Sequence, residues 1–324
     1  MIRIYGKKRA LNALTNFGRS GRMPHALLLY GARGIGKRTL ADYAAMTYMC
    51  AKHGAVPCME CNECRRVSEH IHPDVVYPLK LMGDKERYNI DGLRQLISDC
   101  YIRPNDGDVR VCVFEKLDEM LPQHQNALLK FIEEPLEFNR YIFTAEKKVS
   151  ILETILSRVT AVEVDGADEA GFTAALAEKG IEKARAAELF GRFGGNIGAA
   201  LAFEESGEEL QYMNAAVSAA DAIASHRETA CLTAFLSLKT RDDMFETLGI
   251  LSDILAEAAA KRGGKPASGA FGAQADKLAG AYSMKAITRM YNEAVRLYGM
   301  SFTNPNLRLF AGECCGALFT AADM

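Results

Sequence analysis

A glycine-rich turn between an apolar run and a helical segment constrains this chain more than any other feature of its sequence. The stretch from Met23 to Thr39 reads MPHALLLYGARGIGKRT, and its residues 26–30 are apolar enough to form a buried parallel strand. Glycine permits positive φ angles and close backbone approach, so successive N–H groups can surround an anion at a helix N-terminus. Strand, turn and helix in this order predict a phosphate-binding P-loop. Its contact residues would be Gly31, Gly34, Gly36 and Lys37.

Two positions depart from what ATP hydrolysis needs. Arg38 stands where a nucleotide hydrolase has the Ser or Thr that ligates Mg²⁺. The apolar run at residues 109–114 ends at Glu115 and Lys116, where P-loop ATPases carry one carboxylate for Mg²⁺ and a second that polarises the attacking water. Lysine cannot act as that base, and its charge repels Mg²⁺. The loop could bind ATP without turnover, or its glycines could serve only to join strand and helix; the sequence leaves both open.

Four of the nine cysteines fall within residues 50–64: Cys50, Cys58, Cys61 and Cys64. Tetrahedral zinc takes four thiolates, and paired Cys-x2-Cys steps let backbone turns aim their sulfurs at one ion. Because four cysteines fill the coordination shell and a catalytic zinc keeps an open position, we expect a structural Zn²⁺ site. The alternative is a cluster of buried or redox-active thiols without metal.

Apolar runs alternate with helical segments through the first half of the chain. The runs lie at residues 26–30, 74–79, 109–114, 141–145 and 159–164. This alternation predicts an α/β fold with a doubly wound parallel sheet, in which ligands bind at the carboxyl ends of the strands. After Asp165 the composition shifts to Ala, Glu and Lys, which predicts a core at 1–165, a small helical domain at 166–206 and an all-α domain at 207–324. Within the last domain, residues 276–298 are expected to form one helix.

Net charge and hydropathy argue against two classes of function, nucleic-acid binding and membrane insertion. A formal net charge of −2 gives no sequence-wide case for nucleic-acid binding, which needs a basic face. The N-terminal segment lacks the apolar core of a signal peptide, and no apolar run approaches the ~20 residues of a spanning helix. We therefore expect a cytoplasmic protein with no membrane partner. A zinc-ribbon nucleic-acid binder is an alternative, since Lys52, Arg65 and Arg66 neighbour the cysteines.

Several segments together resemble one family. They are PHALLLYGARGIGKR, the four-cysteine insert that follows it, VCVFEKLDEM with NALLKFIEEP, and TILSR, and they are similar to the AAA+ subunits of the bacterial DNA polymerase III clamp loader. These motifs span about residues 1–205, and beyond them the helical character and the TNPNLRLF segment fit that family's collar domain. The resemblance implies an AAA+ P-loop core, a helical lid at 166–206 and an oligomerising collar at 207–324.

The family contains two kinds of subunit, the gamma/tau ATPases and the delta-prime stator, which does not hydrolyse ATP. Arg38, Lys116 and Gly198 alter three parts of an ATPase site, since gamma/tau subunits carry a lid arginine where Gly198 stands. Ser157 and Arg158 nevertheless keep the family's Ser-Arg-Cys motif, whose arginine enters the ATP site of a neighbouring subunit. The chain therefore resembles the delta-prime type.

This resemblance implies a subunit without ATPase activity of its own that assembles with gamma/tau and delta subunits in a DNA polymerase holoenzyme. The assembled complex would load the sliding clamp onto primer-template DNA. Arg158 would act in trans as an arginine finger, because a planar, permanently charged guanidinium stabilises the transferred phosphoryl group. Without the resemblance, a solvated surface arginine would be the plainer interpretation. The alternative function is an active gamma/tau-type ATPase in which Thr39 replaces the missing hydroxyl, although one residue along a helix turns a side chain by about 100°.

Overall fold

The computed structural model describes residues 2–78, 90–206, 211–264, 271–302 and 305–323. Its backbone divides into two compact units, of which the first contains residues 1–187 with 195–199 and the second contains 188–194 with 200–324. The predicted small helical domain at 166–206 is shared between the units, and its status as a separate domain stays a prediction. None of the helices in the described ranges is both long and apolar enough to cross a membrane.

The first unit is built on a five-stranded sheet in which all neighbouring strands are parallel. The strands are β1 (Ala26–Tyr30), β2 (Val75–Val76), β3 (Arg110–Phe114), β4 (Asn139–Ala145) and β5 (Thr160–Glu163). They lie in the order β2-β3-β4-β1-β5, so the chain crosses the sheet repeatedly and the predicted doubly wound parallel sheet is confirmed. Parallel strands end at one edge, which brings the turn after Tyr30 and the turn after Phe114 together.

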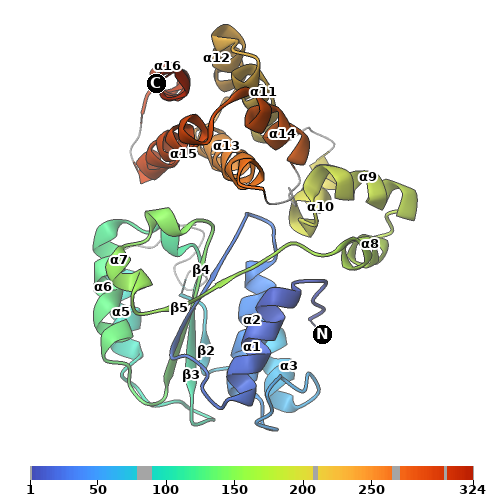
Figure 1. Cartoon of the computed structure of the whole chain (residues 1–324). Coiled ribbons are helices and arrows are strands. Elements are labelled where there is room, and N and C mark those ends of the chain that lie inside the picture. The colour runs from blue at the N-terminus through green and yellow to red at the C-terminus, as the bar shows by residue number, and fades with distance from the viewer. Residues whose placement is uncertain (1, 79–89, 207–210, 265–270, 303–304, 324) are drawn as a thin grey trace. The chain divides into compact units, whose positions relative to one another are not determined.

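Helices cover both faces of this sheet (Figure 1). One face carries α1 (Lys8–Arg19), α2 (Lys37–Met49) and α3 (Asn62–Ser68), and the other carries α5 (Ile90–Asp99), α6 (Pro122–Glu133) and α7 (Glu153–Leu156). Side chains of β1 alternate between the two cores: Leu27 and Leu29 pack toward α2, whereas Leu28 packs toward α6. All three leucines are fully buried, and each such burial is worth roughly 1.5–3 kcal/mol. The central strand therefore fixes the turn that follows it.

The described part of the second unit is helical and has one continuous apolar core. Its helices include α11 (Gln211–Ala224), α12 (Glu228–Leu236), α13 (Arg241–Arg262), α14 (Gly272–Ala281), α15 (Met284–Tyr298) and α16 (Leu307–Asp323). The single helix expected at 276–298 is wrong, because the chain ends α14 at Ala281 and begins α15 at Met284. Ser283 caps the new helix, its hydroxyl accepting the backbone N–H of Ala286 at 3.2 Å. Of the TNPNLRLF segment, Thr303 and Asn304 lie outside the described residues.

Candidate functional site

The predicted P-loop joins the carboxyl end of β1 to the N-terminus of α2. Three of its glycines have φ angles of 155° (Gly31), 76° (Gly34) and 93° (Gly36), and Gly36 is the residue that precedes the helix. Side chains are disfavoured in this left-handed region, so glycine is what permits the turn here. The predicted order of strand, turn and helix is therefore present, with Gly31, Gly34 and Gly36 in the turn and Lys37 as the first residue of α2.

Two lysines of the protein itself bind the carbonyl oxygens of this loop. The Lys37 ammonium donates to the carbonyls of Gly31 at 2.7 Å and Ala32 at 3.0 Å. The Lys7 side chain is buried, and its ammonium donates to the carbonyls of Ile35 and Asp165. Burial lowers the pKa of Lys7, and the nearby carboxylate of Asp165 partly offsets that effect. Lys7 could not be identified from the sequence, because it lies far from the motif along the chain.

The outer side of the loop is in backbone contact with residues 195–199, which belong to the same unit. The N–H of Gly198 donates to the carbonyl of Gly34 at 3.1 Å, and the Asn196 amide donates to the carbonyl of Arg33 at 2.7 Å. A Cβ atom at residue 198 would lie 2.5 Å from the Gly34 oxygen, well inside van der Waals contact. The contact therefore requires glycine at 198, because a side chain at this position would collide with the backbone of Gly34.

At the edge where Mg²⁺ would be held, the protein places an ion pair. The Arg38 guanidinium, on the first turn of α2, has its Nε 3.1 Å from Oε1 of Glu115, which follows β3. Lys116 comes next with a φ of 57°, and its ammonium lies 3.4 Å from the carboxylate of Glu119. Sequence reasoning identified these positions separately, and the sheet brings Arg38 and Glu115 into contact. The result is an arginine–carboxylate pair at the position of a metal–carboxylate pair.

Arg158 lies away from this loop. It follows α7 and stands two positions before β5, whose Thr160 is in register with Leu27 of β1. Tyr30, the last residue before the P-loop, is in register with Glu163 instead. Thr160 lies three strand residues, about 10 Å, before Glu163, and Arg158 precedes Thr160 in the turn after α7. Arg158 and the P-loop therefore lie toward opposite ends of the strands.

The side chain of Arg158 is held by three neighbours. Its Nε lies 2.9 Å from Oε1 of Glu133, the last residue of α6, and the two side chains are 41% and 44% exposed respectively. Its Nη1 donates to the carbonyl of Thr154 and to the hydroxyl oxygen of Ser157, each at 3.0 Å. Ser157 in turn donates its own proton to the Thr154 carbonyl at 3.1 Å. The sequence predicted Ser157 and Arg158, whereas the part played by Glu133 becomes visible only in the fold.

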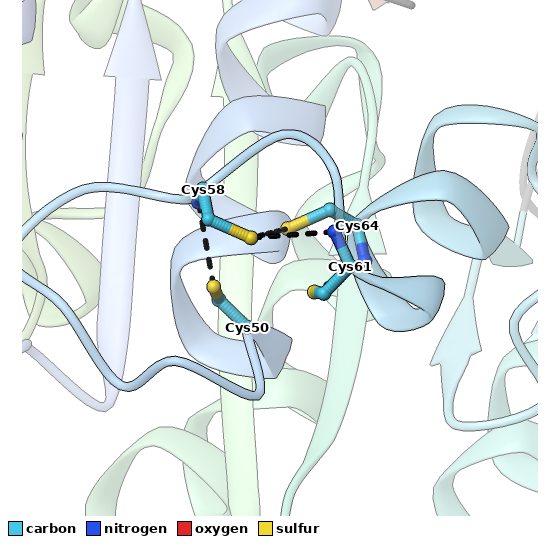
Figure 2. Close-up of side chains that lie close together, drawn as sticks. All are labelled: Cys50, Cys58, Cys61 and Cys64. Atoms are coloured by element: carbon cyan, nitrogen blue, oxygen red, sulfur yellow. Dashed lines mark hydrogen bonds between the residues drawn. The ribbon is translucent and has the colours of Figure 1, made fainter.

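The four predicted cysteines converge on one point (Figure 2). Cys50 ends α2, Cys58 and Cys61 lie in the following loop, and Cys64 is on the first turn of α3. All four sulfurs lie within 4.8 Å of one another, and those of Cys58 and Cys64 are 4.0 Å apart. A tetrahedral site with Zn–S bonds of ~2.3 Å needs sulfurs about 3.8 Å apart. The donor set and its spacing therefore fit a four-coordinate thiolate site.

Backbone N–H groups surround these sulfurs. The amide of Cys58 points to the sulfur of Cys50 at 3.4 Å, that of Cys61 to Cys58 at 3.3 Å, and that of Cys64 to Cys61 at 3.4 Å. The backbone N–H of Glu60, with those neighbouring donors, lowers the pKa of the Cys58 thiol to about 6. Burial instead raises the pKa of Cys64. Such donors stabilise thiolates, the form that binds metal.

The basic side chains beside the cysteines contact the protein itself. Lys52 pairs with Glu60 at 2.7 Å, and Arg65 donates to the carbonyl of Glu60. Arg66 pairs with Asp106 at 2.7 Å. These contacts are those of a solvated and internally paired surface, and they leave the zinc-ribbon nucleic-acid binder without structural support.

Comparison with known proteins places the first unit in a family. The family model for the DNA polymerase III delta subunit matches residues 6–167. The delta' subunit of Bacillus subtilis is 31% identical over 152 residues, which cover 46% of this chain and 45% of that protein. The delta' subunit of Pseudomonas aeruginosa is 31% identical over 159 residues, with 49% and 48% covered. The tau/gamma subunit of Haemophilus influenzae is 29% identical over 177 residues, with 54% and 25% covered.

The matched region thus spans a quarter to about half of the length of these relatives. Among solved structures, a DNA polymerase III gamma subunit-related protein from Thermotoga maritima overlaps 97% of this chain and 99% of its own. That overlap has a TM-score of 0.38 and 15% identity, which is too distant to bear on function.

Proposed function

This chain belongs to the DNA polymerase III delta subunit family, and from that premise we propose that it is a stator of the delta-prime type in a clamp loader. In this role it assembles with gamma/tau-type and delta-type subunits and helps to load a sliding clamp onto primer-template DNA. It does not hydrolyse ATP, and it supplies Arg158 to the ATP site of a neighbouring subunit. The observation that carries the proposal is the ion pair between Arg38 and Glu115.

That ion pair opposes Mg²⁺ binding in two ways. Glu115 is already neutralised by a guanidinium, so a metal ion would have to displace Arg38 from it. If Arg38 stayed nearby, its charge and the double charge of Mg²⁺ ~4 Å apart would repel by about 2 kcal/mol in water and about 8 kcal/mol in a protein-like medium. Lys116, whose ammonium faces Glu119, adds a further positive charge after the same strand. Phosphoryl transfer depends on a metal ion to neutralise developing charge, so this site is poorly suited to it.

The position of Arg158 supports action on a neighbour. Because it precedes β5, whereas Gly31 and Lys37 follow the end of β1, Arg158 is poorly placed to reach a phosphate in its own P-loop. Its side chain is nevertheless 41% exposed, and its guanidinium is held by Glu133, Thr154 and Ser157. This placement favours contact with a phosphate on another molecule.

We further propose that the four cysteines hold one structural Zn²⁺. The residues Cys50, Cys58, Cys61 and Cys64 would close the coordination shell, and a closed shell supplies stability rather than chemistry. The zinc would tie the end of α2 to the start of α3. No step of ATP hydrolysis involves it.

Reconstitution of the complex tests the main proposal. The isolated chain is expected to show no ATP turnover, and a complex containing Arg158→Ala is expected to assemble normally. Hydrolysis at the one site that Arg158 completes should fall by about a thousandfold or more. Arg19→Ala, which removes another exposed arginine of the same unit, serves as the control. Turnover by the isolated chain would favour a gamma/tau-type ATPase, and unchanged hydrolysis with Arg158→Ala would exclude the trans finger.

A further inference from the structure

Glu133 contacts Arg158 on Nε, a nitrogen that Thr154 and Ser157 do not contact. The guanidinium has five N–H groups in a plane, one on Nε and two on each terminal nitrogen. Glu133 receives the Nε proton, at 2.9 Å, and Nη1 gives its two protons to Thr154 and Ser157. Nη2 makes no hydrogen bond to any residue that the structure describes. Nε and Nη1 are thus held by protein groups, and Nη2 is the one guanidinium nitrogen without such a contact among the described residues.

We propose that Glu133 is a positioning residue that holds Arg158 so that its Nη2 group can meet a phosphate on the neighbouring subunit, an inference that rests on the proposed function of Arg158. An arginine side chain has several rotatable bonds, and holding it in one geometry removes the freedom that would otherwise oppose catalysis. The ion pair is half exposed, so its contribution to folding stability is small. The role of the ion pair is therefore to orient the Arg158 side chain.

This arrangement also explains why the finger has to be arginine. Glu133 holds the guanidinium through Nε, and a phosphate would be bound through Nη2, so the contact to Glu133 survives when Nη2 meets a phosphate. A lysine has one nitrogen, which cannot pair with Glu133 and reach outward along a fixed direction. Ser157 supports the same geometry, since its hydroxyl bridges Nη1 and the carbonyl of Thr154.

Steady-state ATP hydrolysis by the reconstituted complex tests this inference with four variants of this chain. Arg158→Ala defines the whole of the activity that depends on the finger. Glu133→Ala is expected to remove most of that activity, about tenfold at the affected site, with the KM for ATP unchanged. Glu133→Gln keeps an oxygen that can accept from Nε, so it should retain more activity than the alanine variant. Glu134→Ala, the adjacent exposed glutamate without a contact to Arg158, should behave as wild type.

The double variant Glu133→Ala/Arg158→Ala separates positioning from an independent effect. It should hydrolyse ATP no more slowly than Arg158→Ala alone, because Glu133 acts only through the arginine. If Arg158→Ala lowers hydrolysis and Glu133→Ala does not, the positioning role is wrong and the proposed function stands. If Arg158→Ala itself has no effect, both fail. An additive loss in the double variant would show that Glu133 acts on something other than Arg158.

Discussion

The backbone N–H of Gly198 donates a hydrogen bond to the carbonyl of Gly34, at 3.1 Å, and leaves no room for a side chain between the two glycines. Residue 198 is thus held against the loop by its backbone and carries no side chain there. It joins residues 195–199 to the P-loop within one unit.

Gly198→Ala is expected to destabilise the first unit. The added Cβ would lie 2.5 Å from the Gly34 oxygen, so the two segments have to separate, at a cost of about 1–3 kcal/mol in the free energy of unfolding. Urea unfolding measures this. Gly191→Ala is the control, because a Cβ there meets nothing within 4 Å and alanine favours its helix. Equal stability of the two variants would show that the Gly34–Gly198 contact does not form.

Lys37→Ala is expected to leave ATP hydrolysis by the assembled complex nearly unchanged. The Lys37 ammonium binds the loop's own carbonyls, at 2.7 Å and 3.0 Å, and the proposed stator hydrolyses no ATP. Comparison with Arg158→Ala in the same assay gives the scale, since that variant removes the contribution made in trans. A loss with Lys37→Ala as large as that with Arg158→Ala would mean that this P-loop takes part in catalysis.

Protein purified without added metal is expected to contain about one zinc per chain. Cys61→Ser should lower the zinc content and the thermal stability together, because three thiolates no longer close the shell. Elemental analysis and thermal unfolding check both. Cys231→Ala, which removes a buried cysteine of the second unit, should leave the zinc content as it is. Zinc-free protein of full stability would contradict the assignment.

Asp74 is expected to make stability depend on acid pH. Burial alone would raise the pKa of this carboxyl, but the backbone N–H groups of Asn105, Asp106 and Gly107 outweigh it and lower the pKa below its ordinary value. The charged or titratable side chains around it are Arg66, His72 and Arg110.

A carboxyl whose folded pKa is lowered stabilises the protein above its unfolded pKa, about 3.9, and this contribution is lost as pH falls through the folded value. Asp74→Asn should therefore cost about 1–3 kcal/mol at pH 7 and flatten the fall in stability below pH 4. Urea unfolding across pH 2–7 measures this. Asp106→Asn is the control, because its exposed carboxylate pairs with Arg66 at the surface. An unchanged acid limb in Asp74→Asn would show that other carboxyls set it.

The sequence by itself determined the features that depend on neighbouring residues. Apolar runs such as residues 26–30 became strands because alternate side chains of β1 enter two separate cores. The glycines at 31, 34 and 36 specified a turn with positive φ angles. The spacing of the cysteines at 58, 61 and 64 brought their sulfurs together through two short backbone turns. Such patterns act over a few residues, so no knowledge of the fold is needed to see them.

Other features depend on residues that lie far apart in the chain, and only the tertiary structure decided them. The break between α14 and α15 was one, because Tyr282, which lies between these helices, is buried and its hydroxyl donates to the carbonyl of Ile223 on α11 at 2.8 Å. Partner choice was another. Arg38 meets Glu115, and Glu133 meets Arg158, because strand order and the crossover helices set which side chains share an edge. A sequence offers many oppositely charged partners for one charged side chain, and the packing of the fold selects the partner that lies close enough to pair with it.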